Sequence, residues 1–141
     1  VKNIPTQSFE KRNNNMRKIM ANDLHTWSLV QKQMKIRIIY LFQPTISWSV
    51  RKSTDYEKQI IEFEKKRIKK YYQNDFTSKK VYLDTKNFIK KECKKNSIDF
   101  YDSNVMISNS DKKKDFFIDF VHLSDYGYEY IAKIIDRILL K

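Results

Sequence analysis

One short apolar stretch does most to limit the folds open to this sequence. Residues 35–42 read Lys-Ile-Arg-Ile-Ile-Tyr-Leu-Phe, and their second half is β-branched, aromatic and almost free of polar side chains. Such a run is typical of a strand that is buried on both faces of a parallel sheet. Gln43 and Pro44 follow directly. Because proline cannot extend a central strand, we expect the strand to end there.

Helical patterns surround this strand. Four segments place apolar residues three and four positions apart, which is the period of an amphipathic helix, namely residues 9–33, 54–72, 78–95 and 125–140. The expected inward positions are Met16, Ile19, Met20, Leu24, Trp27 and Val30 in the first segment and Tyr128, Ile131, Ala132, Ile135, Ile138 and Leu139 in the last. Thr54 and Glu57 have the spacing of a capping box, which supports a helix start at that point.

A second, shorter strand is expected at residues 98–102, and the polar residues 103–114 after it are expected to form a loop. Strands that alternate with helices favour a parallel sheet with helices on both faces. Two strands alone make a poor sheet. We therefore expect residues 1–141 to be a single partial domain of the α/β class, the C-terminal portion of a three-layer α/β/α domain.

The residues that carry candidate chemistry lie just before the last predicted helix. Asp119 stands three positions ahead of His122, and Ser124 marks the start of the helix. Where the backbone turns between them, the carboxylate can accept a hydrogen bond from the imidazole, fix its tautomer and stabilise the imidazolium that forms on proton transfer. This spacing indicates His122 as a general base and Asp119 as the residue that orients it. The alternative is a surface Asp and a loop His beside an ordinary helix.

The residues around this pair are more specific than the pair itself. The stretch reads Asp-x-x-His-Leu-Ser-x-x-Gly-Tyr-x-x-Ile-Ala-x-x-Ile. It resembles the last conserved block of the SGNH (GDSL-type) hydrolases, which are serine esterases, lipases and carbohydrate acetyl-esterases. The resemblance implies a flavodoxin-like α/β/α fold, hydrolysis of ester bonds, and Asp119 and His122 as two members of a Ser-His-Asp triad.

Gln43 is a weaker candidate. In an open α/β sheet, ligands bind at the carboxyl ends of the strands. A strand that ends in Gln-Pro also looks like a later strand of several SGNH enzymes, so the resemblance implies that Gln43 lines the substrate site. The alternative is a glutamine that merely caps the end of the strand.

The other parts of the family's active site are missing from the sequence. In that family a serine in an early Gly-Asp-Ser block attacks the ester carbonyl, and backbone N–H groups with a Gly and an Asn stabilise the oxyanion. The 141 residues contain one glycine, Gly127, and no Gly-Asp-Ser, and Asn22 lies inside a helical pattern. We therefore expect the nucleophile in a missing N-terminal half of the domain. The alternative that the chain is a degenerate relative that has lost catalysis also stays open.

The net charge of +12 suggests a further alternative, a non-catalytic basic helical module that binds nucleic acid, an anionic surface or a protein partner. The lysines occur in doublets between apolar positions, as the solvated faces of helices would place them, so nucleic acid is the less favoured partner. The favoured partners are the missing half of the domain and an ester substrate, whether a small molecule, a glycan or a lipid.

No cofactor and no metal are expected, because Cys93 stands alone without a Cys-x-x-Cys motif. The longest apolar run, residues 38–42, is far too short to cross a bilayer. The cellular location stays open.

Overall fold

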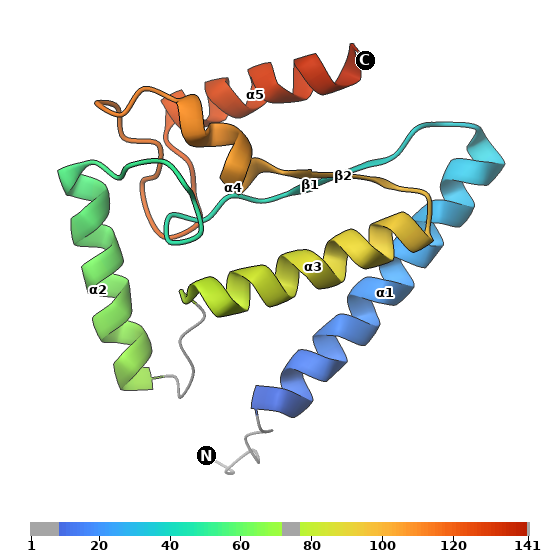
Figure 1. Cartoon of the computed structure of the whole chain (residues 1–141), viewed down its shortest axis with the longest axis horizontal. Coiled ribbons are helices and arrows are strands. Elements are labelled where there is room, and N and C mark those ends of the chain that lie inside the picture. Colours follow the sequence, from blue (N-terminus) through green and yellow to red (C-terminus); the bar gives the residue numbers. More distant parts are fainter. Residues whose placement is uncertain (1–8, 72–76, 141) are drawn as a thin grey trace, which may run out of the picture. The chain divides into compact units, whose positions relative to one another are not determined.

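The computed structural model describes residues 9–71 and 77–140. Its elements follow in the order α1 (Phe9–Met34), β1 (Ile39–Phe42), α2 (Asp55–Tyr71), α3 (Lys79–Lys95), β2 (Asp99–Asp102), α4 (Ser103–Met106), the 3-10 turn η1 (Ile107–Asn109) and α5 (Asp125–Leu139) (Figure 1). The strands β1 and β2 lie side by side in a small parallel sheet, and the chain is mostly helical. The expected mixed α/β class and the expected order of the main helices and strands are confirmed.

The strand β1 is shorter than the apolar stretch suggested. Lys35 has a left-handed φ of 53°, and Gln31 at the end of α1 accepts hydrogen bonds from the backbone N–H groups of Ile36 (3.3 Å) and Ile38 (2.8 Å). These contacts use residues 35–38 to turn the chain out of the helix. Of the strand that remains, Phe42 is the buried residue, and the other three are partly exposed.

The prediction of a loop after the second strand is wrong for its first residues. Asp102 caps the one-turn helix α4 by accepting a hydrogen bond from the backbone N–H of Asn104 at 3.1 Å. The hydroxyl of Ser103 donates to the carbonyl oxygen of Phe42. Ser103 and Asn104 are fully buried, because this turn is held by contacts with the chain around β1 that no local pattern reveals.

The chain divides into two compact units, Val1–Tyr40 with Thr85–Phe100 and Leu41–Asp84 with Tyr101–Lys141. In the first unit Leu24, Ile89 and Cys93 are buried, and Gln31 donates to the carbonyl oxygen of Ser97 at 2.9 Å. An apolar cavity of about 440 Å³ lies between α1 and the start of β1 in this unit. Three of the α1 residues expected to point inward are instead exposed, namely Met16, Ile19 and Trp27.

The second unit has the larger apolar core, which includes Phe42, Ile46, Tyr82, Ile107, Phe116, Phe117, Leu123, Ile131, Ile134 and Ile138. On α5 the buried positions are 127, 131, 134 and 138, which share one face of a helix. The expected stripe was therefore only partly right. Ile131 and Ile138 face the core, whereas Tyr128 and Leu139 are exposed and Ile134 takes a core position that the pattern did not indicate.

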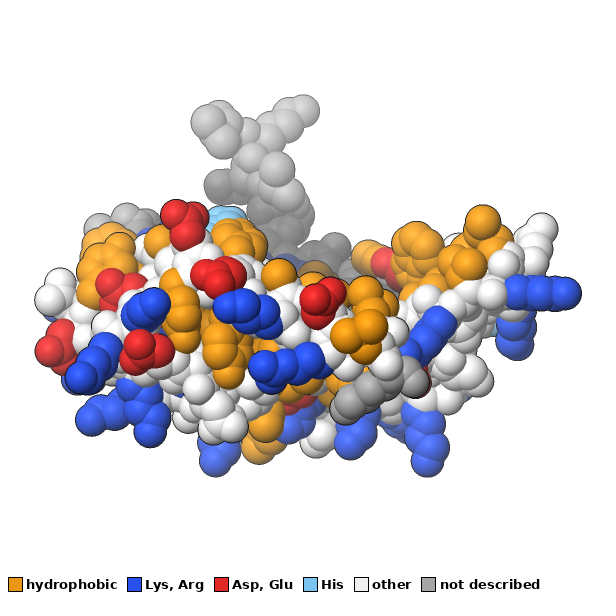
Figure 2. All heavy atoms as spheres, turned by 90° about the horizontal axis from the view of Figure 1, so that it is seen from above, with side chains coloured by type: hydrophobic (Ala, Val, Ile, Leu, Met, Phe, Trp, Pro, Cys, Tyr) orange, Lys and Arg blue, Asp and Glu red, His pale blue; other side chains and the backbone are white. Residues whose placement is uncertain are grey.

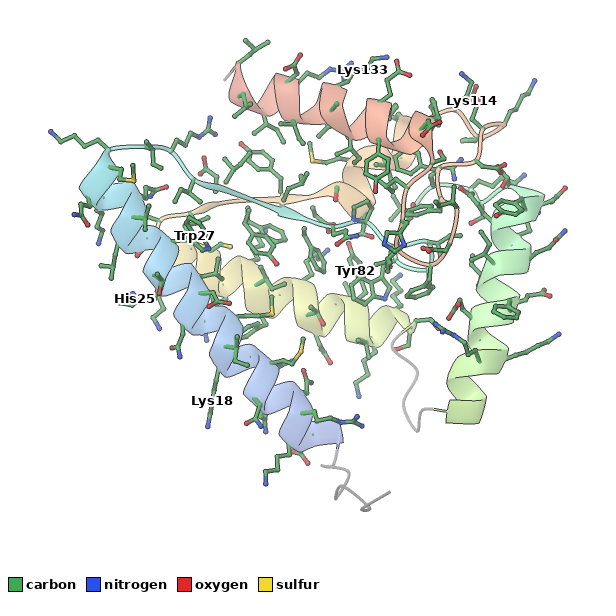
Figure 3. The ribbon with its side chains drawn as sticks, turned by 180° about the vertical axis from the view of Figure 1, so that it is seen from behind. Lys18, His25, Trp27, Tyr82, Lys114 and Lys133 are labelled. Carbon is green, nitrogen blue, oxygen red and sulfur yellow. The ribbon has the colours of Figure 1, made fainter. Side chains whose placement is uncertain are left out.

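Figure 2 shows how the basic residues are distributed on one face of the protein. On the face drawn in Figure 2, Lys and Arg side chains are interspersed with acidic and apolar ones and do not form one continuous patch. Lys133, for example, projects from α5 and pairs with Glu129 one turn away at 2.6 Å (Figure 3). Across the described residues, no helix combines the length and the apolar character needed to cross a membrane.

Candidate functional site

Asp119 and His122 lie in a tight turn between η1 and α5. The backbone N–H of Ile118 donates to the carbonyl oxygen of His122 at 3.0 Å, and that of Ser124 donates to the carbonyl oxygen of Phe116 at 2.9 Å. These two bonds close the base of the turn. We call residues 116–124 the site hairpin.

The structure brings the two predicted site residues together. Nδ1 of His122 lies 2.6 Å from Oδ2 of Asp119. The other carboxylate oxygen, Oδ1, accepts hydrogen bonds from the backbone N–H groups of Val121 at 2.9 Å and His122 at 2.7 Å. The three-residue spacing works because the Asp side chain is fixed by the backbone of the turn that it precedes.

These contacts favour the ionised form of the Asp119 carboxyl. Partial desolvation acts to raise the pKa of the carboxyl, but hydrogen bonds from the His122 ring and from the backbone N–H groups of His122 and Val121 outweigh it and hold the pKa below its ordinary value. An ionised carboxylate can only accept, so the Nδ1 that faces it carries the proton. The neutral imidazole therefore has its lone pair on Nε2.

The pair is open to solvent. The side chain of His122 is 63% exposed and that of Asp119 is 51% exposed. Within the described part of the chain, no group hydrogen bonds to Nε2 of His122. The arrangement can take a proton from a group that reaches Nε2 from outside these residues.

The helix that follows begins where the sequence predicts. Ser124 caps α5 by accepting a hydrogen bond from the backbone N–H of Gly127 at 3.1 Å. Its hydroxyl also donates to the carbonyl oxygen of Asp115 at 2.6 Å. The cap therefore ties the first turn of α5 to the chain that enters the site hairpin.

Gln43 lies against the same hairpin. Its side-chain amide donates to the carbonyl oxygen of Val121 at 3.2 Å, and the nearby backbone N–H of Ile46 donates to the carbonyl oxygen of Phe120 at 3.1 Å. The tertiary fold thus places the predicted lining residue beside the Asp119–His122 turn. That Gln43 contacts a substrate stays a prediction.

Sequence reasoning missed the buried polar groups that support this region. Arg51 and Glu57 form an ion pair with side chains 1% and 0% exposed. Asn104, also fully buried, accepts from the backbone N–H of Thr45 at 2.9 Å and donates to the carbonyl oxygen of Gln43 at 3.2 Å. No sequence signal marks Arg51 or Asn104. The Arg51–Glu57 pair is six residues apart, outside any helical or strand spacing, and the other contacts of Arg51 and those of Asn104 with Gln43 and Thr45 span about sixty residues.

One signal for Glu57 did exist. The predicted capping box is confirmed, since the N–H of Thr54 donates to Glu57 Oε2 at 2.9 Å and the N–H of Glu57 donates to Thr54 Oγ1 at 3.2 Å. The capping-box pattern predicts the hydrogen bond from the Thr54 N–H to the Glu57 carboxylate. It does not predict the contacts of that carboxylate with Arg51, Phe116 and Phe117.

Within residues 9–71 and 77–140, no three His, Cys, Asp or Glu side chains are grouped so that they could hold a metal ion. The chemistry that the Asp119–His122 pair offers is proton transfer.

No model of a known protein family matches the sequence, and a search of curated proteins finds no match.

Proposed function

We propose that this chain is part of a serine hydrolase of the SGNH type that cleaves an ester bond, with His122 as general base and Asp119 as its orienting partner. The single observation that carries the proposal is the 2.6 Å contact between His122 Nδ1 and Asp119 Oδ2. It gives the imidazole one defined tautomer, which is what a Ser-His-Asp triad requires.

In the proposed reaction, Nε2 of His122 accepts the proton of the attacking serine hydroxyl and later returns a proton to the leaving alcohol. The carboxylate of Asp119 stabilises the imidazolium between these steps and stays ionised throughout. A water molecule then hydrolyses the acyl-enzyme, with His122 again as base.

The exposure of the pair fits the proposal that the serine and the oxyanion groups come from polypeptide outside these 141 residues. A general base that is 63% exposed is surrounded by competing water. A polypeptide segment that places the nucleophilic serine next to Nε2 would also shield the His122 imidazole from water. The acyl group and the alcohol are left open, so the substrate is an acyl or acetyl ester of a lipid, a carbohydrate or a small molecule.

The test uses the longest polypeptide that the native gene encodes. Hydrolysis of a short-chain aryl ester is compared between the wild type and the variants His122→Ala and Asp119→Asn. We expect each to lower kcat/KM about a hundredfold or more. A fluorophosphonate probe should label one serine of the wild type, and that residue would identify the nucleophile.

Two matched controls separate chemistry from folding. His25→Ala removes the other histidine of the chain, which is exposed on α1 (Figure 3). Asp136→Asn removes an exposed carboxylate from α5. Both controls should keep wild-type activity. If the full polypeptide is inactive, or if the pair variants match the wild type, the hydrolase proposal fails.

In that case the basic binding module is the remaining candidate, and it makes its own prediction. Affinity for nucleic acid would fall steeply with salt, with a slope set by the number of phosphates neutralised.

A further inference from the structure

A buried ion pair lies behind the site hairpin, and the proposed reaction does not use it. Nη1 of Arg51 lies 2.7 Å and 2.5 Å from the two carboxylate oxygens of Glu57. Burying two charges costs several kcal/mol per ion unless further hydrogen bonds satisfy both groups. The role of the pair therefore follows from the other groups to which Arg51 and Glu57 are hydrogen bonded.

Arg51 binds the start of the segment that leads to the site hairpin. Its Nε donates to the hydroxyl of Ser110 at 3.0 Å, and its Nη2 donates to the carbonyl oxygens of Asp111 at 3.2 Å and Lys114 at 3.0 Å. The guanidinium also lies 5.5 Å from the centre of the Phe116 ring. Apart from Nη1, which faces Glu57, the donor nitrogens of the guanidinium are thus all directed at one short segment, residues 110–114.

Glu57 binds the end of the same segment. Its Oε1 accepts hydrogen bonds from the backbone N–H groups of Phe116 at 2.7 Å and Phe117 at 3.2 Å. The carboxylate belongs to the first turn of α2, and Figure 1 shows the loop between η1 and α5 next to that turn. Thr54, which caps α2, adds a hydrogen bond from its hydroxyl to Asp115 Oδ1 at 2.5 Å.

The residues held by Glu57 are the base of the site hairpin. Phe117 pairs with Leu123 in an antiparallel bridge, and the carbonyl oxygen of Phe116 accepts from the N–H of Ser124. Asp119 and His122 lie between these two paired positions. A shift of Phe116 or Phe117 therefore moves one side of the turn in which Nδ1 and Oδ2 meet.

We propose that Arg51 and Glu57 are positioning residues that hold the site hairpin in the register where Asp119 orients His122. The catalytic part of this inference rests on the proposed function, whereas the structural part does not. An apolar pair of the same volume could not replace them. It would remove the Glu57 acceptor from three backbone N–H groups, those of Thr54, Phe116 and Phe117, and the Arg51 donor from the carbonyl oxygen of Lys114.

The readout is the tautomer of His122. The chain has two histidines, so ¹⁵N-histidine labelling gives spectra of His122 and His25 alone. In the wild type we expect His122 to show an Nδ1–H ring with a downfield proton, and His25 in the other unit to serve as an internal reference. In Glu57→Gln and Arg51→Lys we expect His122 to lose that signature and to resemble His122 in Asp119→Asn, while the His25 signals do not move.

A matched ion pair on α2 provides the control. Glu64 and Arg67 pair at 2.8 Å about two helical turns after Glu57, and neither residue takes part in the contacts described above. Glu64→Gln removes a pair of the same chemistry and should leave the His122 signature unchanged. The far-UV circular dichroism of each variant shows that it is folded.

A second measurement needs no variant to fold. In the wild type, hydrogen exchange of the Phe116 and Phe117 amides reports release from Glu57, and that of the Val121 and His122 amides reports release from Asp119. If the ion pair holds the hairpin, all four amides should exchange with the same protection factor and respond equally to denaturant.

The inference is overturned if folded Glu57→Gln and Arg51→Lys keep the His122 signature, or if the two pairs of amides exchange independently. Neither readout requires turnover. If the signature depends on Glu57 but the full polypeptide has no esterase activity, the positioning role stands and the proposed function falls. In an active polypeptide, Arg51→Lys should lower kcat about tenfold or more and leave KM near its wild-type value.

Discussion

A Cβ atom at Gly127 would lie 2.4 Å from the carbonyl oxygen of Phe116, closer than real side chains approach a backbone oxygen. The same carbonyl accepts the hydrogen bond that closes the base of the site hairpin. Gly127, the single glycine of the chain, is therefore required by close packing between α5 and the hairpin. Its φ is not positive, so conformational freedom is not the reason.

Gly127→Ala should destabilise the protein by about 1–3 kcal/mol, because overpacking outweighs the better helix propensity of alanine, which is worth about 1 kcal/mol. Urea unfolding measures the change. Ala132→Gly, the reverse substitution at an exposed position of α5, is the control and should cost about 1 kcal/mol by propensity alone. A Gly127→Ala protein as stable as the wild type would contradict the packing argument.

Ser124→Ala should lower stability by about 0.5–2 kcal/mol, because it removes the cap on Gly127 N–H and the hydrogen bond to Asp115. In thermal unfolding this corresponds to a fall in Tm of about 2–8 °C. Ser53→Ala, which removes a serine hydroxyl outside any helix, should stay within about 0.5 kcal/mol. Ser124→Thr should recover most of the loss, and failure to do so would show that the hydroxyl is not the stabilising group.

The pKa of Asp119 predicts how the pair responds to acid. A carboxyl whose pKa is lower in the folded state than its ordinary 3.8 stabilises the fold above pH 3.8, and this contribution is lost as the pH falls through the folded pKa. Since the side chains of Asp119 and His122 are both half exposed or more, we expect this contribution to the free energy of unfolding to be less than about 1 kcal/mol.

NMR titration of the carboxyl carbons checks this directly. Asp119 should titrate below 3.8 in the wild type and move towards 3.8 in His122→Ala, because the ring hydrogen bond is gone. The stability difference between the wild type and Asp119→Asn should shrink as the pH falls below 3.8. An Asp119 that titrates at or above 3.8 in the wild type would remove the electrostatic basis of the proposed tautomer.

Cys93 predicts the opposite dependence at high pH. Burial, with a smaller contribution from Glu92, raises the pKa of the thiol from 9.0 to about 11. Because the folded state keeps the proton longer than the unfolded state, stability should fall between pH 9.0 and about 11. Unfolding free energies of the wild type and Cys93→Ala across this range isolate the effect, since only the wild type carries the thiol.

The same cysteine reports on opening of its unit. With no exposed surface, Cys93 should react with a thiol reagent at pH 8 far more slowly in the native protein than in urea. Fast reaction under native conditions would show that the thiol is not buried in solution.

Many features of this structure could be predicted from residues that are close together in the sequence. The main helices, the end of β1 ahead of Pro44, the capping box of Thr54 and Glu57, and the Ser124 cap all depend on neighbours within about four positions, where the backbone's own geometry fixes which groups can meet. The contact between Asp119 and His122 is of the same kind, since a turn of three residues is enough to form it.

Only the tertiary structure decided which side chains share an environment. It buried Ile134 and exposed Tyr128 on one helix, placed Gln43 against Val121, and joined Arg51 and Glu57 to a segment about sixty residues away. Periodicity shows that a helix has an apolar side, but the face that is buried depends on what packs against it. A polar residue such as Arg51 carries no local mark of burial, because only the fold brings its partners within reach, namely the Glu57 carboxylate, the Ser110 hydroxyl and two backbone carbonyl oxygens.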